Sequence, residues 1–341
     1  MNNFHRNNHY VPQNYLKRWS SDGLKIWSYC ILVNDQKVPF WKLHSIRGVA
    51  FHAHLYTRIS AGSETDEFEC WFEKEFETPV QEALDKVTSD RHLTPNDWER
   101  LIRFAAAQNV RTPSKLSISM ERWRTEMPEL LNNTLQKAVQ DLGEANRTGN
   151  LPKNNNIKNT DIFPLRVTRE PLPNTDKSLL KVETIIGRSM WLYGIKHILT
   201  NTVKVLLQHK WCILHAAPGI EWATSDDPVI CLNYYENRSY DFGGGWGNKG
   251  SEIIFPLSPH HILYTKIGHR SPYCKEVTYE LSTLFQRMIV EHAHRWIFAK
   301  NPSQEIEVLR PRKIDAIACN NEMEAWKNWH DEQSSAEKEY E

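Results

Sequence analysis

Glutamine, arginine and histidine side chains extend the apolar stripes of two predicted helices, at positions where a buried face normally stays apolar. In the helix predicted from residue 95, Trp98, Leu101 and Ala105 form a stripe at steps of three and four, and Gln108 and Arg111 continue it. A polar side chain on a buried face must find hydrogen-bond partners or belong to a site. We therefore interpret Gln108 and Arg111 as candidate catalytic or positioning residues.

The second stripe lies on the helix predicted from residue 276, where Leu281, Phe285 and Met288 are followed by His292 and Arg295. A guanidinium offers five donors in a planar fork that matches phosphate or carboxylate, so two inward arginines indicate an anion-binding pocket. The alternative is structural, because an arginine in a last helical turn also satisfies terminal carbonyls and interacts well with the helix dipole.

The stretch ATSDDPVI, residues 223–230, places Ser225, Asp226 and Asp227 directly after a predicted strand and before a proline. Residues of these types commonly form turns. Alternatively, Asp226 is a strand-end carboxylate that orients an imidazole, acts as a base or holds a divalent cation such as Mg²⁺ or Mn²⁺. Asp227 is expected to point inward less than Asp226 does.

The stretch NNHYVPQNYLKRW, residues 7–19, concentrates polar and stiff residues ahead of a short predicted helix. Pro12 suits the first position of that helix, because its missing N–H costs nothing there. We expect this anchoring to direct His9 and Gln13 into a cleft between two lobes. Histidine titrates near neutral pH, so His9 is the candidate general acid or base.

The elements that must position these residues predict an α+β fold of small antiparallel sheets packed with long amphipathic helices. The acids between Glu67 and Glu77 are expected on a solvated helix face, with Glu75 the exception because it borders the apolar stripe. Strands are predicted within 24–59 and 211–267, and helices at 65–88, 95–112, 114–147, 185–209 and 276–296.

These elements divide into two interleaved lobes. Residues 1–150 are predicted to form an N-terminal lobe and residues 179–331 a C-terminal lobe. Between them, residues 151–178, rich in Asn, Pro, Thr and Lys, are predicted to be an exposed insertion or linker. Residues 332–341 are expected to form a frayed tail.

Composition excludes few function classes. The 42 basic and 42 acidic residues of the 341-residue chain cancel, so nonspecific electrostatic capture of nucleic acid is not expected, although a local basic groove remains compatible with neutrality. The six cysteines form no C-x-x-C pair, and no apolar stretch is long enough for a membrane helix or a signal peptide. We expect a cytoplasmic protein without a membrane partner.

Five blocks in order, HYVPQNYLKRW, LIRFAAAQNVRTP, WATSDDPVI, FPLSPHHILY and EHAHRWIFA, together resemble the domain-of-unknown-function family 4238. Its members are found mainly in bacteria and their viruses and carry an N-terminal H-x-V-P box. The resemblance runs from about residue 5 to 299. It implies no reaction, but it selects the residues His9, Pro12, Gln13, Gln108, Arg111, Pro113, Ser225, Asp226, Pro228 and Pro256 to Pro259.

Two functions of different classes fit these residues. In the first, a phosphodiesterase or nuclease of phage-defence or toxin type, Arg111 and Arg295 hold the phosphoryl group, His9 transfers protons, Asp226 orients His9 or holds a metal, and Gln108 positions substrate or water. Gln13, Ser225 and His292 would then contact the substrate. The alternative is a non-catalytic module that binds a nucleotide or a partner. Under both, the five blocks must converge in space.

Overall fold

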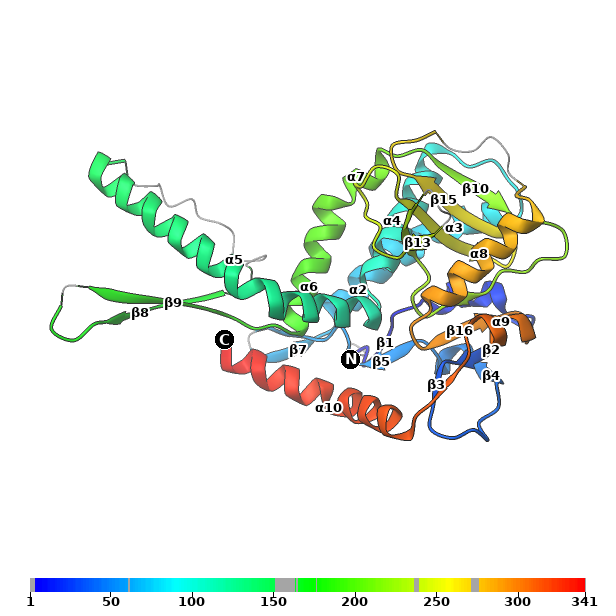
Figure 1. The fold of residues 1–341 in the computed structure, drawn as a ribbon, viewed down its shortest axis with the longest axis horizontal. Helices are drawn as coiled ribbons and strands as arrows, with labels where there is room; N and C mark the ends of the chain where they lie inside the picture. Colours follow the sequence, from blue (N-terminus) through cyan, green and yellow to red (C-terminus); the bar gives the residue numbers. More distant parts are fainter. Residues whose placement is uncertain are drawn as a thin grey trace.

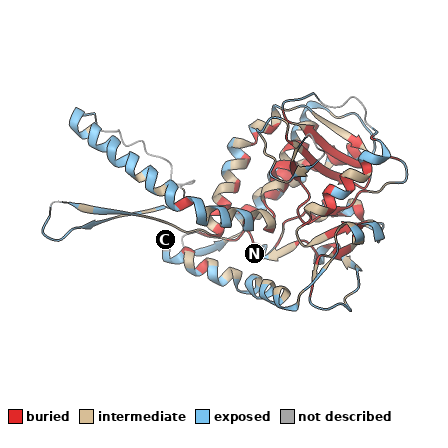
Figure 2. Cartoon of the chain, in the orientation of Figure 1, coloured by how far each residue is buried: buried red, intermediate tan, exposed pale blue. Residues whose placement is uncertain are grey.

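A computed structural model describes residues 4–60, 62–150, 163, 165–175, 177–235, 239–270 and 276–340. The fold is α+β, as the strand and helix patterns predicted. A globular body carries the sheets, and two arms project from it to one side (Figure 1). Figure 2 shows that buried residues concentrate in the body, whereas the arms are exposed along most of their length.

The larger sheet has five antiparallel strands in the order β10-β15-β14-β12-β13. They are β10 (Trp211–His215), β12 (Ile230–Tyr234), β13 (Tyr240–Asp241), β14 (Glu252–Ser258) and β15 (His261–Lys266). Successive side chains of a strand point to opposite faces. Ile253 and Phe255 accordingly pack with α3 (Thr78–Thr88) and α4 (Pro95–Val110), and Ile254 packs with α8 (Tyr279–His292). Burial on both faces explains the nearly continuous apolar sequence of β14.

The smaller sheet joins the two halves of the chain, in the order β11-β16-β2-β4. Its N-terminal strands are β2 (Lys25–Cys30) and β4 (Trp41–Ser45), and its C-terminal strands are β11 (Thr224–Ser225) and β16 (Trp296–Ala299). Strand β2 pairs directly with β16. The main hydrophobic core likewise runs from Tyr10 to Phe298. The two halves are therefore interleaved, and the predicted boundary near residue 150 separates no independent cores.

Shorter strands pair β1 (Asn7–His9) with β5 (Phe51–Ala53), β6 (Arg58–Ser60) with β7 (Ser63–Thr65), and β3 (Leu32–Val33) with β17 (Lys313–Ile314). The helix predicted at 65–88 consists of α2 (Glu67–Phe72), a π-helical segment (Glu73–Glu77) and α3. Helix α4 begins with the expected capping box of Thr94 and Asp97 and with Pro95 in its first turn.

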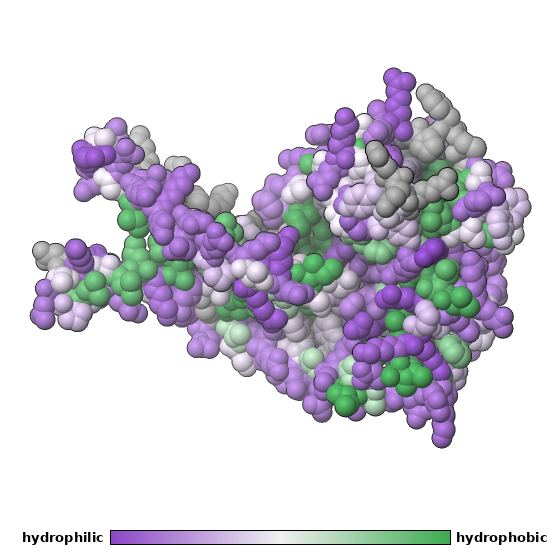
Figure 3. Space-filling view, in the orientation of Figure 1, coloured by the Kyte–Doolittle hydropathy of each residue, from purple (hydrophilic) through white to green (hydrophobic). Residues whose placement is uncertain are grey.

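The two arms are helix α5 (Pro113–Thr148) and the hairpin of β8 (Leu165–Pro171) and β9 (Ser178–Thr184). Residues 151–162, 164 and 176 of the predicted insertion lie outside the described residues. The described remainder is largely exposed, and it forms a regular hairpin that extends six residues beyond the predicted end at 178. Apolar side chains lie exposed along this arm (Figure 3), among them Val167 and Leu179.

The C-terminal segment contains α9 (Gln304–Leu309) and α10 (Ala316–Tyr340). The frayed tail predicted at 332–341 is wrong over its described part, because α10 continues to Tyr340. Glu337 is buried there, and its carboxylate receives the Nε and Nη2 groups of Arg188 at 3.1 and 2.7 Å. Arg188 begins α6 (Arg188–His197), which leads through a π-helical segment (Ile198–Thr202) into α7 (Lys204–Leu207). None of the helices described is long and apolar enough to span a membrane.

Candidate functional site

The N-terminal box is anchored to the end of α4 through the backbone of Tyr10. The Tyr10 carbonyl accepts hydrogen bonds from Gln108 Nε2 at 2.7 Å and from Arg111 Nε at 3.1 Å. His9 ends β1, and Pro12 is the N-cap of α1 (Gln13–Leu16), one position before the first helical position that was predicted for it. The first two sequence blocks are therefore in direct contact, although about 100 residues separate them.

Arg111 points into the protein interior and is 1% exposed. Its Nη1 donates to Glu77 Oε1 at 2.7 Å, and its guanidinium lies 4.9 Å from the centre of the Phe72 ring. The backbone carbonyl of Arg111 accepts the Tyr56 hydroxyl at 2.7 Å. The guanidinium thus bonds to groups from other elements, so it does not serve as a helix-terminal cap.

Glu69 joins this group and was not predicted from the sequence. Burial raises its pKa to about 8, although Arg111 and a hydrogen bond with the His9 backbone oppose that rise. The expected exception, Glu75, is instead exposed, and it is Glu69 and Glu77 that turn inward. The π-helical segment after α2 changes the angular step along the helix. A regular period of 3.6 residues therefore assigns the wrong glutamate to the buried face.

Four buried polar atoms of this group have no hydrogen-bond partner among the described residues: His9 Nε2, Glu69 Oε2, Gln108 Oε1 and Arg111 Nη2. We call His9, Glu69, Glu77, Gln108 and Arg111 the polar cluster. Burial lowers the pKa of His9, and the positive charge of Arg111 lowers it further, against opposing effects of the Arg47 backbone and Glu77. Buried polar atoms are normally hydrogen-bonded, so four unpaired hydrogen-bonding atoms in one cluster make it a candidate ligand site.

Asp226 is buried, and its carboxylate holds a segment of the backbone in place. Its two carboxylate oxygens accept the N–H groups of His294 at 2.9 Å and of Arg295 at 2.7 Å, just after α8. Burial raises the pKa of Asp226 to about 7, and those same N–H groups oppose the rise. Among the described residues, this carboxylate accepts its hydrogen bonds from backbone N–H groups. These contacts do not orient His9, which was the role predicted for Asp226.

Asp227 points inward as well, which corrects the expectation that it would do so less than Asp226. Its carboxylate accepts the Thr112 hydroxyl at 3.1 Å and lies 3.6 Å from Lys115 Nζ and 3.8 Å from His292 Nε2. The other ring nitrogen of His292 bonds to the Asp227 carbonyl at 2.8 Å. Ser225 Oγ accepts the Asp227 N–H at 3.2 Å. Ser225 and His292 therefore fix the SDDP turn.

A second candidate compartment, which we call the aromatic pocket, lies on the side of Tyr10 that faces Asp226. Its volume is about 240 Å³. Residues of four of the five blocks line it, with Pro113 from the second block. The N-terminal sheet region and α10 supply the rest. The full lining is Tyr10, His44, Gly48, Val49, Ala50, Phe51, His52, Pro113, Asp226, His294, Arg295, Trp296, Glu322 and Trp326.

Stacked rings form one wall of the aromatic pocket. The His52 ring stacks on Trp326 with centroids 3.7 Å apart and on Tyr10 with centroids 5.5 Å apart. Burial lowers the pKa of His52 to about 4, so this imidazole is neutral at physiological pH. Arg295 contributes charge at the pocket, and its Nε donates to Glu322 Oε2 at 2.7 Å.

The predicted site residues thus fall into three sets. His9, Gln108 and Arg111 meet in the polar cluster, and Asp226 and Arg295 line the aromatic pocket. Tyr10 connects the two compartments, since its carbonyl belongs to the first and its ring to the second. The third set lines neither compartment: Ser225 and His292 bond to Asp227, and Gln13 is half-buried in α1.

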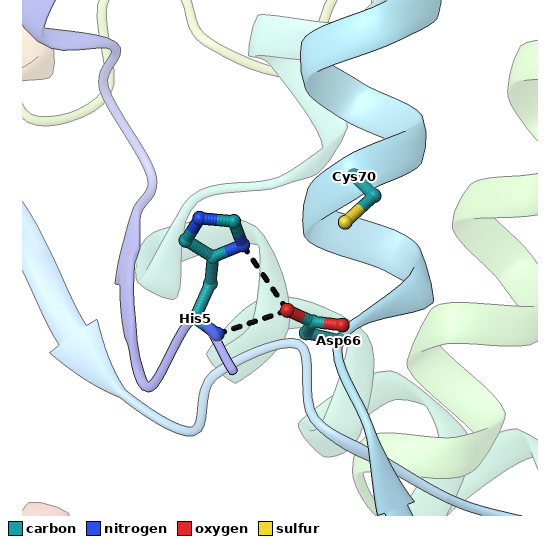
Figure 4. Close-up of side chains that lie close together, drawn as sticks. All are labelled: His5, Asp66 and Cys70. Carbon is teal, nitrogen blue, oxygen red and sulfur yellow. Dashed lines mark hydrogen bonds and ion pairs between the residues drawn. The ribbon is translucent and has the colours of Figure 1, made fainter. Parts of the chain in front are cut away.

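The sequence analysis placed a metal ion, if one is bound, at Asp226. In the parts of the chain that are described, three groups bring ligand atoms within 4.8 Å of one another, and Asp226 is in none of them: His5, Asp66 and Cys70; His54, Glu64 and His330; Asp90, His215 and His261. In the first, the His5 backbone N–H and ring Nδ1 converge on one Asp66 oxygen at 2.9 and 3.1 Å (Figure 4). Burial and nearby acids raise the pKa of Cys70, which keeps it a thiol. The hydrogen bonds of this group attach the N-terminal segment to the start of α2.

The second group is held by hydrogen bonds that a metal would break. Arg188 Nη1 lies 3.1 Å from His330 Nδ1, and a guanidinium can only donate. His330 Nδ1 is therefore the acceptor, and Nε2 carries the proton that bonds Glu64 Oε1 at 2.8 Å. A metal ion at Nε2 would require that nitrogen to be bare.

Comparison with known proteins identifies a family but no relative of known activity. The chain belongs to the family described as protein of unknown function (DUF4238), whose model matches residues 7–303. No curated protein matches the sequence, and no solved structure matches it. The match spans the polar cluster and the aromatic pocket, except for the contribution of α10.

Proposed function

We propose that this protein is a phosphodiesterase of the nuclease class and that the polar cluster is its catalytic site. The observation that carries the proposal is the set of four buried, unpartnered atoms on His9, Glu69, Gln108 and Arg111. A substrate that fills them must accept from a guanidinium, donate to an amide oxygen and exchange protons with an imidazole and a carboxyl group. A phosphodiester with its attacking or leaving hydroxyl does all of these.

The proton assignments follow from the opposite pKa shifts of His9 and Glu69. The pKa of His9 is lowered below its ordinary value of 6.5, so its Nε2 is a free base at neutral pH. The pKa of Glu69 is raised to about 8, so its carboxyl group keeps a proton at that pH. Two titratable groups whose environments push their pKa values apart are suited to act as base and acid in one reaction.

The remaining roles follow from geometry. Arg111 Nη2 would donate to a non-bridging phosphate oxygen, while Nε and Nη1 stay fixed on Tyr10 and Glu77. Gln108 Oε1 would accept from the attacking hydroxyl or water. Asp226, predicted to orient His9, is reassigned to holding the turn that places Arg295 at the aromatic pocket.

The aromatic pocket supports a nucleotide substrate. Its 240 Å³ is below the roughly 300 Å³ at which drug-sized ligand sites begin, and it suits a group of the size of a nucleobase. The rings of Tyr10, His52 and Trp326 offer stacking partners, which bind bases with little sequence preference. The same pocket favours the second candidate, a nucleotide-binding module without chemistry.

The experiment is cleavage of labelled single- and double-stranded RNA and DNA by the purified protein, with magnesium, manganese or a chelator. His9→Ala and Glu69→Gln are each expected to lower kcat/KM by about 100-fold or more. Glu75→Gln is the matched control, because Glu75 is an exposed acid on the same helical stretch. Comparison with chelator reports separately whether a divalent cation takes part.

Cleavage that survives both His9→Ala and Glu69→Gln would refute the catalytic assignment. If no substrate is cleaved while nucleotides bind to the wild type and less to Tyr10→Ala, the binding module is the correct function. Circular dichroism and thermal unfolding of each variant separate loss of chemistry from loss of fold.

A further inference from the structure

The third group of ligand residues, Asp90, His215 and His261, lies at the end of the larger sheet, away from the residues assigned to catalysis. His215 is the last residue of β10 and His261 the first of β15, and the two are directly opposed in the antiparallel ladder. Asp90 follows α3, which lies beside this sheet (Figure 1). Two paired strands and the turn after α3 therefore bring these side chains together.

The distances suit a shared ion. Asp90 Oδ1 lies 3.5 Å from His215 Nδ1 and 3.5 Å from His261 Nε2. Ligand atoms of a tetrahedral zinc site with bonds of about 2.0 Å are separated by about 3.3 Å. The separations in this group exceed those of ordinary N–H···O hydrogen bonds, whose mode is about 2.9–3.0 Å. The carboxylate oxygen is equally far from the two imidazole nitrogens, and all three ligand atoms lie within 4.8 Å of one another, close enough to share one metal ion.

The surroundings orient the ligands. The other nitrogen of His261, Nδ1, lies 2.7 Å from Ser258 Oγ, so the ring is held with Nε2 toward Asp90. Histidine ligands of metals are typically fixed in this way through the nitrogen that does not bind the ion. Ser258 and His261 are both buried, whereas the Asp90 side chain is 67% exposed, which leaves access for an ion and for water.

The backbone at Asp90 supports a role for its carboxylate. Asp90 has a φ of 53° at the C-terminus of α3, where the Arg91 N–H bonds to the Lys86 carbonyl at 2.9 Å. Helix ends of this left-handed type favour glycine. The chain instead places there a carboxylate that faces two histidines.

We propose that Asp90, His215 and His261 bind a divalent transition-metal ion of the zinc class. Two imidazoles and one carboxylate favour Zn²⁺ or Co²⁺ over Mg²⁺ and Ca²⁺, which prefer oxygen ligands throughout. Three protein ligands leave at least one position for water. The ion would tie the end of α3 to the edge of the sheet, and the site does not depend on the proposed nuclease function.

The test is titration of the chelator-treated full-length protein with Zn²⁺ by calorimetry and with Co²⁺ by visible absorption. One equivalent is expected to bind, with the spectrum of a nitrogen- and oxygen-ligated Co²⁺ ion. Asp90→Gly and His215→Ala are expected to weaken Zn²⁺ binding at least 100-fold, whereas His260→Ala, which replaces a neighbouring exposed histidine, leaves it unchanged.

Asp90→Gly also keeps the experiment decisive if other variants unfold. Because glycine suits the backbone at residue 90, this variant is expected to melt at the same temperature as wild type or higher without metal, and to lose the increase that Zn²⁺ gives the wild type. Absence of Zn²⁺ binding, binding unaffected by Asp90→Gly and His215→Ala, or an intense cobalt–thiolate band that assigns the ion to cysteines would each overturn the proposal. Nuclease activity is measured in parallel. It tests the proposed catalytic roles of His9 and Glu69 and does not bear on the metal site.

Discussion

At the scale of single residues, the proposed chemistry rests on a carboxyl group that stays protonated at neutral pH, unlike a carboxyl group in water, and on an imidazole that is neutral there. Glu69 keeps its proton to about pH 8. The pKa of His9 lies below its ordinary value, so the imidazole stays neutral to lower pH than usual. Burial causes both shifts, since it disfavours the charged form of either group. Arg111 is held by hydrogen bonds to Glu77 and Tyr10, and its positive charge would attract an anionic substrate to this pair.

The raised pKa of Glu69 predicts how stability depends on pH. The unfolded chain releases this proton near pH 4.5 and the folded chain near pH 8, so between these values the folded state binds more protons and stability falls as pH rises. Glu69→Gln removes that dependence. We expect its stability relative to wild type to increase by at most about 1.4 kcal/mol per pH unit across this interval.

Urea unfolding of wild type, Glu69→Gln and Glu75→Gln at several pH values between about 5 and 8 checks this prediction. Glu75→Gln should follow the wild type, because Glu75 is exposed. Parallel curves for all three proteins would show that Glu69 titrates normally.

Residue-level inference from the sequence succeeded where helical periodicity is regular. Gln108 and Arg111 were predicted to face inward from the stripe of α4, and both are buried. The same reasoning chose Glu75 as the inward acid, because the π-helical segment Glu73–Glu77 interrupts the period. It did not single out Glu69, which lies before that segment in α2. It also assigned chemistry to Asp226, whose partners are backbone N–H groups of a turn that no local pattern predicts.

At the scale of elements, α10 is held to the body by a buried ion pair. Arg188 is fully buried and binds Glu337 through two hydrogen bonds, with Ser334 Oγ a further 3.1 Å contact. Glu337→Ala leaves the guanidinium buried without its counter-charge, and we expect it to destabilise the protein by about 3–5 kcal/mol. Chemical denaturation measures this loss.

Glu332→Ala provides the matched control, because Glu332 is an exposed glutamate of the same helix. Its effect should stay within about 0.5 kcal/mol. Equal effects of the two substitutions would mean that the end of α10 does not dock as described. The sequence predicted a frayed end because the partner, Arg188, is 149 positions away.

The strands and helices of the body were largely predicted, since alternation and 3.6-residue periodicity are local signals. The hairpin of β8 and β9 was not, because its composition of Asn, Pro, Thr and Lys is typical of loops. Pairing with a neighbouring strand decided the structure there, and strand pairing depends on context more than on intrinsic preference.

At the scale of the whole molecule, both halves of the chain build the smaller sheet and the main core. Strand β2, near the start of the sequence, pairs with β16, near its end. We expect a chain cut by a specific protease, at a recognition sequence inserted in the turn between β8 and β9, to remain one complex. Size-exclusion chromatography after cleavage should show a single peak containing both fragments.

Separation of those fragments without denaturant would contradict the interleaved fold. The cut itself should cost little, because the hairpin projects from the body and is exposed (Figure 2). Four of the five blocks that were expected to converge line the aromatic pocket beside Tyr10, as a consequence of the same interleaving. The block FPLSPHHILY does not contribute to that lining, and the sequence did not indicate which atoms meet.

The pH dependence of kcat/KM for phosphodiester cleavage, compared between wild type and Glu69→Gln, decides whether the polar cluster is the catalytic site. We expect a bell-shaped wild-type profile with an acid limb below pH 6.5 from His9 and an alkaline limb near pH 8 from Glu69. Glu69→Gln should lower the rate and lose the alkaline limb. A Glu69→Gln profile that keeps both limbs and the wild-type rate would show that the polar cluster is not the catalytic site.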